Sequence, residues 1–186
     1  MDRNPEQPDE CIFDGFFAMK IEYKDPSQYV SASDQYNGNI SEIKWQSIGD
    51  SSIISYYGYH YDGLDRLTKA LYREKSNFSS FQFNDHKDYY NGDYDYDKAG
   101  NIESVIRNRP TADDNSSYSA DILNYTYQGV RLTGLSDNGN VPAGEHPGMD
   151  LTNGSFNYDV FGNMTSTWRN DQIVYNYSNL PMSIDY

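Results

Sequence analysis

The sequence predicts an all-β fold built from repeated antiparallel β-hairpins. Three observations predict it. A short aromatic motif recurs along the chain, and the residues on either side of each copy alternate between apolar and polar, which is the period of a β-strand. The 19 tyrosines are the third observation, because tyrosine suits a pleated surface on which the ring packs while the hydroxyl stays in water.

The length and the net charge of the chain limit the classes of function to consider. The 186 residues suffice for a domain with a substantial core, and 28 acidic against 14 basic residues give a formal net charge of −14. This charge repels nucleic-acid phosphates and anionic membrane surfaces. No apolar run approaches the roughly 18 residues of a spanning helix. We therefore expect neither nucleic-acid binding nor membrane insertion.

Residue types that carry chemistry are sparse. Cys11 is the only cysteine, so no intrachain disulfide can form. His60, His86 and His146 are scattered, without the spacing of metal ligands. The common phosphate-binding and nucleophile motifs are absent. We therefore expect no metal, no cofactor and no catalytic residue, and the chain is not predicted to be an enzyme.

The repeated motif is clearest in two stretches that align without a gap, YHYDGLDRLTKAL (59–71) and YDYDKAGNIESVI (94–106). In both, Tyr-x-Tyr-Asp leads into a short polar segment, and an apolar residue then begins a new alternating run. FNYDVFGNMTSTW (156–168) is a third full copy. The remaining copies are LNYTYQGVRLTGL (123–135), with a loop one residue shorter, the degenerate VYNYSNLPMSIDY (174–186), with Tyr177 as its anchor and a proline for the usual turn residue, and the partial DQYNGNISEIKW (34–45).

Each copy has the residue pattern of a β-hairpin: an aromatic strand, three to five turn residues and a second alternating strand. Glycines fall where a positive φ is needed, at Gly100, Gly129 and Gly162. Aspartates follow the last strand tyrosine, where they can accept hydrogen bonds from the turn amides. The motif residues expected to have this structural role are Tyr59, Tyr61, Asp62, Arg66, Leu67, Tyr94, Tyr96, Asp97, Gly100, Asn101, Ile102, Tyr125, Tyr127, Gly129, Leu132, Tyr158, Asp159, Gly162, Asn163, Met164, Tyr175 and Tyr177.

One stretch offers a cation-binding alternative. Asp93, Asp95 and Asp97 open like an EF-hand calcium loop. That loop needs glycine at its sixth position and glutamate at its twelfth, where this chain has Lys98 and Ser104. We therefore expect no divalent cation here. Asp97 is interpreted as a turn residue, and the other two aspartates as solvent-side strand residues.

The repeats suggest a simple organisation. Residues 1–33 form an N-terminal segment with an expected strand at 16–23, and residues 34–186 form one continuous repeat domain. Residues 65–76 could also form a helix, but the aligned copies favour a strand. Because a lone hairpin is marginal in water, each unit needs a neighbour stacked beside it. Six units do not obviously close a barrel, so an open curved sheet is expected.

These copies resemble the YD-repeat or Rhs-repeat family, whose repeat reads roughly Tyr-x-Tyr-Asp-x-x-Gly-Arg-Leu. YHYDGLDRLTKA lacks only the glycine, where Asp65 stands, and the copies YDYDKAGNIESV and FNYDVFGNMTST have Gly-Asn in place of Gly-Arg. The resemblance covers residues 34–186. It implies a partial fragment of a hollow spiral shell of stacked hairpins. Such shells enclose a C-terminal toxin in bacterial Rhs and insecticidal Tc toxin proteins, and form the barrel of teneurin adhesion receptors.

The resemblance implies a non-catalytic wall segment of such a shell. Its partners would be the rest of a longer parent shell and an enclosed toxin domain, and its location secreted or at the cell surface, although this chain shows no signal peptide. The Asp-Pro pair that ends the toxin shells is absent, since the only Asp-Pro is Asp25-Pro26. The alternative is a cell-surface module that binds carbohydrate or protein with its tyrosine-rich face.

The edges of such a sheet predict self-association. Unpaired strand backbones template pairing with another chain. The terminal stretch from Ile173 to Tyr186 is aromatic and carries a single charge at Asp185. Only Pro181 interrupts its hydrogen-bond donors. We expect copies to associate through sheet edges.

Overall fold

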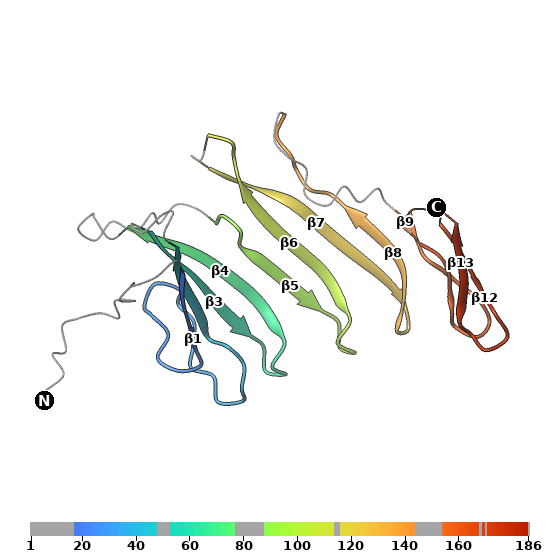
Figure 1. The fold of residues 1–186 in the computed structure, drawn as a ribbon, viewed down its shortest axis with the longest axis horizontal. Helices are drawn as coiled ribbons and strands as arrows, with labels where there is room; N and C mark the ends of the chain where they lie inside the picture. The colour runs from blue at the N-terminus through green and yellow to red at the C-terminus, as the bar shows by residue number, and fades with distance from the viewer. Residues whose placement is uncertain are drawn as a thin grey trace, which may run out of the picture. The chain divides into compact units, whose positions relative to one another are not determined.

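A computed structural model describes residues 17–47, 53–76, 88–113, 116–143, 154–167, 169 and 171–185. These residues form 13 β-strands and no helix, and all strand pairs are antiparallel, which confirms the all-β prediction. The sheets are open, because the described strands pair in chain order and do not close into a barrel. The chain divides into two compact units, Met1–Tyr90 and Asn91–Tyr186 (Figure 1).

In the described part of the first unit, four strands pair in chain order. A strand was expected at residues 16–23, and the structure has one at Phe17–Glu22. The stretch 65–76, for which a helix was the alternative, lies largely in a strand. The four strands are β1 (Phe17–Glu22), β2 (Glu42–Ser47), β3 (Ile53–Tyr61) and β4 (Leu67–Ser76).

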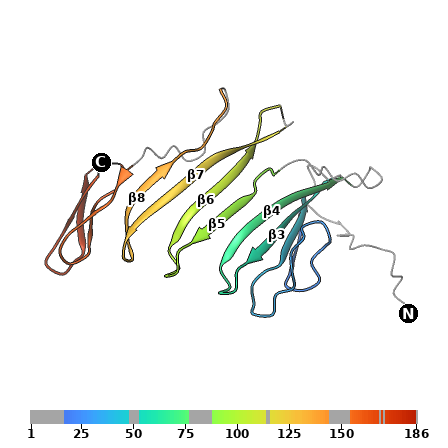
Figure 2. The same ribbon diagram turned by 180° about the vertical axis from the view of Figure 1, so that it is seen from behind.

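The described part of the second unit contains nine strands in two groups, and the strands of each group pair in chain order (Figures 1 and 2). The two groups are joined at Phe156, which separates the last strand of the first group from the first strand of the second. The Phe156 amide donates to the Thr133 carbonyl at 3.1 Å. The strands before this point are β5 (Gly92–Tyr96), β6 (Ile102–Pro110), β7 (Ser117–Gln128), β8 (Arg131–Asp137) and β9 (Gly154–Ser155). Those after it are β10 (Asn157–Tyr158), β11 (Met164–Ser166), β12 (Gln172–Tyr175) and β13 (Pro181–Asp185).

Five hairpins share one register. In each, the pairing shifts just before an anchor tyrosine, which then pairs with the residue that opens, or lies second in, the following strand. A bulge of this kind strengthens the local twist. The anchor pairs are Tyr61–Leu67, Tyr96–Ile102, Tyr127–Leu132, Tyr158–Met164 and Tyr175–Pro181.

The last of these pairs corrects the expected alignment of the fifth copy. The sequence predicts Tyr177 as its anchor, but Tyr175 occupies that place and Tyr177 lies fully exposed in the turn. Pro181 is not a turn residue, because it opens β13. The reason is that Asn176 replaces the turn aspartate, so the visible Tyr-x-Tyr pair is displaced by two residues.

The partial sixth copy is not a hairpin. The strand before it, β1, ends at Glu22, and residues 23–41 form a long connection to β2. Within this connection the Gln35 amide donates to the Tyr23 carbonyl at 2.7 Å. Gly38 keeps the positive φ of the motif, at 94°. The copy therefore retains the turn and the following strand but has no first strand directly before its tyrosine.

The 23–41 connection covers one face of the first sheet. Val30 is 1% exposed and clusters with Ile54 and Tyr56. A Cβ on Gly58 would lie 2.3 Å from the Val30 Cβ, so the glycine allows the connection to reach the sheet. In the second unit the small core is Val105 and Leu123, with Tyr94, Ile102, Tyr125 and Leu135 packed against them.

Candidate functional site

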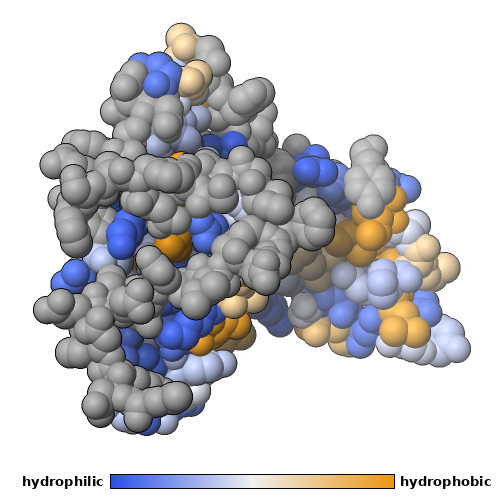
Figure 3. All heavy atoms as spheres, turned by 60° about the vertical axis from the view of Figure 1, so that its left-hand side comes forward, coloured by the Kyte–Doolittle hydropathy of each residue, from blue (hydrophilic) through white to orange (hydrophobic). Residues whose placement is uncertain are grey.

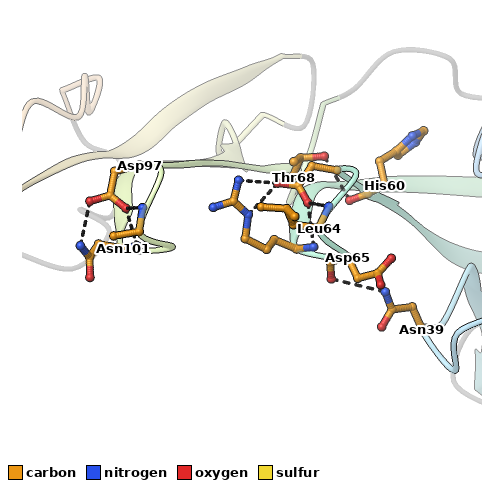
Figure 4. A network of polar contacts seen from close by, with 10 residues as sticks. Asn39, His60, Leu64, Asp65, Thr68, Asp97 and Asn101 are labelled. Carbon is orange, nitrogen blue, oxygen red and sulfur yellow. Dashed lines mark hydrogen bonds and ion pairs between the residues drawn. The ribbon is translucent and has the colours of Figure 1, made fainter. Parts of the chain in front are cut away.

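The repeated hairpin turn is the first candidate site, and Asp97 shows its geometry. Its Oδ1 accepts the backbone amides of Ala99 and Asn101, both at 2.8 Å, and its Oδ2 accepts the Asn101 Nδ2 at 2.7 Å (Figure 4). The Asp97 amide donates to the Asn101 carbonyl, and the Gly100 amide donates to the Asp97 carbonyl. Gly100 has a φ of 92°, as predicted from its place in the motif.

Three other turns repeat this pattern of bonds. At Asp159 the amide partners are Phe161 and Asn163, both at 2.9 Å. At Asp62 the partners are Leu64 and Arg66, at 2.8 and 3.0 Å, and the Arg66 guanidinium replaces the asparagine amide on Oδ2. The fourth turn uses the Asn176 Oδ1, which accepts the amides of Ser178 and Leu180 at 2.8 and 3.1 Å.

These bonds hold the turn carboxylates in their charged form. The pKa of Asp97 and that of Asp159 are lowered, first by the side-chain amide of Asn101 or Asn163. The pKa of Asp62 is lowered first by the Arg66 backbone amide. Oxygens that already accept these donors are poorly available to a substrate or metal ion.

The stretch that resembled a calcium loop lies in β5 and in the turn that follows it. Asp95 is exposed, and its carboxylate accepts the Ser104 hydroxyl at 2.9 Å. In the part of the chain that the structure describes, no group of three His, Cys, Asp or Glu side chains could hold a metal ion. That no divalent cation binds at Asp93, Asp95 and Asp97 stays a prediction.

Two tyrosines connect neighbouring hairpins or strands through their hydroxyls. The Tyr61 hydroxyl donates to the Ile40 carbonyl at 2.8 Å, and the Tyr158 hydroxyl donates to the Leu132 carbonyl at 2.9 Å. Both acceptors lie just after a motif turn: Ile40 in the last residues of the connection before β2, and Leu132 near the start of β8. The anchor tyrosine therefore bonds to a neighbouring segment of the chain as well as pairing within its own hairpin.

Asparagines connect successive turns. Asn39 donates to the Asp65 carbonyl at 3.4 Å (Figure 4), Asn101 to the Gly129 carbonyl at 3.5 Å, and Asn163 to the Asn179 Oδ1 at 3.0 Å. Each acceptor residue has a positive φ, at 63°, 63° and 57° respectively. These links were not predicted from the sequence, although the Gly-Asn pair in three copies was a signal for them.

The motif residues lie in comparable places. The first strands carry Tyr59 and Tyr61, Tyr94 and Tyr96, Tyr125 and Tyr127, Tyr158, and Tyr175, and the turns carry Asp62, Arg66, Asp97, Gly100, Asn101, Gly129, Asp159, Gly162, Asn163 and Tyr177. The second strands carry Leu67, Ile102, Leu132 and Met164. These residues are thus spread over separate turns and strand ends, and they do not converge on one pocket.

An aromatic cluster on the first unit is the second candidate site. Trp45 stacks on Tyr57 at 5.8 Å between ring centroids, and Tyr57 stacks on Tyr59 at 6.0 Å. Tyr72 packs against Trp45 and Tyr57 and meets Tyr90 edge-on at 5.3 Å. Tyr72 is buried, which raises the pKa of its hydroxyl, and this hydroxyl bonds to Ser55 and Glu74. The five rings are the aromatic cluster.

The aromatic cluster continues into apolar residues of β1. Ile21 and Met19 share the face of their β2 partners Ile43 and Trp45, and Met19 is 55% exposed. On the side of the molecule that Figure 3 draws, hydrophobic residues form separate groups among hydrophilic ones. The aromatic cluster and the apolar face of β1 together offer apolar contact area.

The opposite face of the same sheet buries charges. Glu42 and Lys44 on β2 are 0% and 2% exposed. Ser27, in the 23–41 connection, donates its amide to the Glu42 Oε2 at 2.9 Å and bonds to the same oxygen through its hydroxyl. This glutamate fastens the connection to the sheet. This burial of charge was not predicted from the sequence, because alternating charges on a strand ordinarily indicate a solvated face.

One shallow depression lies on the second unit. It has a volume of about 450 Å³ and is lined by Thr126, Gly134, Leu135, Ser136, Gly154 and Ser155. None of these side chains ionises in the ordinary pH range, and the site offers no pairing of a nucleophile with a base. We assign no chemistry to it.

The fold and the turns define the chain as an antiparallel β-hairpin repeat with a tyrosine-rich aromatic cluster. Neither the known protein-family models nor the curated proteins include a match to the chain. Within the described ranges, no helix is long and apolar enough to cross a membrane.

Proposed function

We propose that the chain is a non-catalytic wall segment of a YD-type repeat shell. The shell belongs to a longer protein, secreted or on the cell surface, and either encloses a C-terminal toxin domain or forms a surface barrel. The partners of this chain are then the remaining hairpins of the shell and the enclosed domain. The proposal is supported by the sequence motif together with the recurrence of one turn geometry in four hairpins.

One observation carries this proposal: the polar groups of the motif bond to the chain itself. The Tyr158 hydroxyl and the Asn163 amide each reach a neighbouring strand or turn, and the Asp159 carboxylate accepts its own turn amides. A wall needs such ties between neighbours, because a single hairpin is marginal in water. A catalytic or binding site would instead direct these groups toward a ligand.

An antibody raised against the chain tests the wall proposal in the cells that produce it. We expect the antibody to detect a polypeptide well above 21.4 kDa, the mass of this chain, in the medium or on intact cells. Limited proteolysis should release the repeat region as a resistant fragment, because its hairpins support one another. A protein of 21 kDa confined to the cell interior would contradict the proposal.

The second candidate function is a module that binds carbohydrate or protein through the aromatic cluster. The exposure of Tyr90 at 49% and Met19 at 55% favours it. The stacking of Tyr57 on both Trp45 and Tyr59 disfavours it, because these contacts already use the faces of aromatic rings that a ligand would need. Sugars bind aromatic residues mainly through a free ring face.

Tryptophan fluorescence separates the two functions. The chain has two tryptophans, so Trp168→Phe leaves Trp45 as the only reporter. Under the wall proposal, a panel of sugars leaves the Trp45 emission unchanged. A saturable change that disappears in a Tyr57→Phe or Tyr90→Ala variant would establish the binding module instead.

A further inference from the structure

We propose that the outer edge of β13 takes β1 of a second copy of this chain as an added antiparallel strand, in a single register. The inference rests on the geometry of the strand junctions and is independent of the proposed function.

The edge of β13 is suited to strand addition. All five of its residues are exposed, and among the described strands it pairs only with β12. Met182 and Ile184 are 70% and 46% exposed and lie on one face. An exposed strand with apolar side chains and few charges is a template for another strand.

Two junctions within the chain show how one hairpin receives the next strand. In the β2–β3 pair, continuing the observed register places Ile40 opposite His60, and Tyr61, the next residue, donates to the Ile40 carbonyl. In the β8–β9 pair, the same continuation places Leu132 opposite Asn157. Tyr158 again follows and donates to the Leu132 carbonyl. The tyrosine is therefore one residue beyond the partner of its acceptor in both junctions.

β1 has the sequence that this junction requires. Stretches that enter a hairpin read apolar-x-Tyr before the turn, as Tyr59 to Tyr61 do in β3. Residues 19–23 read Met-Lys-Ile-Glu-Tyr, so Tyr23 has the place of an anchor. Among the described strands β1 pairs only with β2, and Tyr23 is 46% exposed. Its second edge is the natural counterpart of β13.

Applying the junction rule fixes the register. The carbonyl of Pro181 corresponds to those of Ile40 and Leu132, so Tyr23 of the second copy donates to it and Glu22 lies opposite Pro181. The pairs that follow are Met182 with Ile21, Ser183 with Lys20, Ile184 with Met19, and Asp185 with Ala18. The exposed apolar side chains of both strands then share one face, and Asp185 lies diagonally from Lys20 on the other face.

This contact is head-to-tail, so each added copy presents a new β13 edge. Such heterologous contacts extend into open assemblies unless a rotation closes them. The net charge of −14 opposes association at low ionic strength. Added salt screens this repulsion, so the average mass in sedimentation velocity should rise with salt and with protein concentration.

Disulfide trapping tests the register directly. In a Cys11→Ser background, a Ser183→Cys variant is mixed with a Lys20→Cys variant and oxidised, so that a mixed dimer can arise only between two molecules. Directly opposed strand residues have the Cα separation that a disulfide needs. We expect the mixed dimer to exceed by several-fold that obtained with Ala18→Cys or Glu22→Cys, which are two residues out of register. Equal yields, or no mixed dimer, overturn the inference.

The trapping also distinguishes the competing pairing of two β13 edges. A Ser183→Cys homodimer that forms in preference to the mixed dimer overturns the proposal in favour of a two-fold arrangement. A matched pair of lysine variants checks association without cysteine: Ile184→Lys should return the chain to monomer, because a lysine repels an incoming strand at an edge. Val160→Lys adds the same charge at a turn residue that is 90% exposed and should leave association in place. Equal effects of the two lysines also overturn the proposal.

Discussion

The sheet of β1–β4 and the sheet of β10–β13 have the same kind of turn but very different interiors. In the first sheet, Val30, Ile54 and Tyr56 are buried under the 23–41 connection. Among the described residues from 154 to 185, only Asp171 is buried. Nevertheless, the turns at Asp62 and Asp159 have the same backbone bonds and the same pair of side-chain-to-amide bonds.

This difference shows that the turns and the core depend on different parts of the sequence. The turn is determined by a few consecutive residues and needs no core, because an aspartate accepts amides that are close in sequence. The core depends on a connection that comes from elsewhere in the chain and covers the sheet. Changes to the connection should therefore affect the first sheet alone, and changes to a turn should act alike in both sheets.

The largest effect is expected from Gly58→Ala. The added Cβ would lie 2.3 Å from the Val30 Cβ and 2.9 Å from the Val30 carbonyl oxygen, so the 23–41 connection must move. Overpacking of this kind costs about 1–3 kcal/mol. Urea denaturation followed by Trp45 fluorescence, with Trp168 replaced by phenylalanine, should show this loss of stability.

Gly134→Ala is the matched control, since its Cβ would meet Thr126 at an ordinary distance of 3.5 Å. We expect little change in stability from it. If Gly58→Ala also increased amide exchange in β12 and β13, the two sheets would not differ in the way that we describe.

A smaller, local effect is expected from removing a turn carboxylate. Asp62→Ala and Asp159→Ala should each speed amide exchange at the two turn amides that the carboxylate accepts, to a similar degree. Asp95→Ala is the control, because that carboxylate accepts a serine hydroxyl and no turn amide is assigned to it. A large effect at Asp62 alone would show that the turn depends on the core.

Acid should loosen the aspartate turns but not the asparagine turn. The pKa of Asp62, Asp97 and Asp159 is lowered in the folded chain. Their contribution to stability is therefore present above the unfolded pKa of about 3.9 and is lost as the pH falls through the lowered folded value. The turn at Asn176 has no carboxylate at that position.

Amide exchange measured between pH 5 and pH 2, corrected for intrinsic rates, checks this prediction. Protection at Ala99 and Phe161 should decrease as their aspartates become protonated. Protection at Ser178 should follow only the global stability. Parallel losses at all three amides would mean that the carboxylates are not the cause.

The smallest effect is expected from the asparagine links between turns. Asn163→Ala removes a bond of 3.0 Å to Asn179, and a hydrogen bond contributes about 0.5–1.5 kcal/mol, with an exposed one at the low end. Asn101→Ala removes a longer bond of 3.5 Å to Gly129 and should disturb the following turn less. Exchange at the Leu180 and Arg131 amides compares the two. A larger increase in amide exchange in Asn101→Ala than in Asn163→Ala would contradict this prediction.

The turns and strands could be predicted from the sequence because their determinants are local. The residue types of Asp97 and Gly100 alone predict a turn, and the alternation of apolar and polar residues with a period of two predicts the strands. The predicted anchor of the fifth copy, Tyr177, was wrong because the motif specifies aspartate at the turn position. Asn176 occupies this position and accepts the turn amides as an aspartate would. A rule based on hydrogen-bond capacity, in which Asp and Asn are equivalent, would have selected Tyr175.

The covering connection and the buried charges could not be predicted. Residues 34–45 match the motif, and only the distance to β1 shows that no hairpin forms there. Glu42 and Lys44 alternate with apolar residues, and their burial depends on a segment that packs over them from outside the strand. The Tyr61 and Asn163 ties join separate strands or turns, so no local pattern contains both partners.

The fixed geometry of the turns leaves the other end of each hairpin open to change in length. Insertion of one residue into an aspartate turn would change the spacing between the carboxylate and the two amides, two and four residues further along, that donate to it. The β6–β7 connection has no such constraint, because the bond from the Thr111 amide to the Ser116 carbonyl closes it at its base. A foreign peptide grafted between these two residues would project from the end of the hairpin without shifting the strands. Strand β6 thus has a motif turn of fixed geometry at one end and, at the other, a connection that accepts insertions.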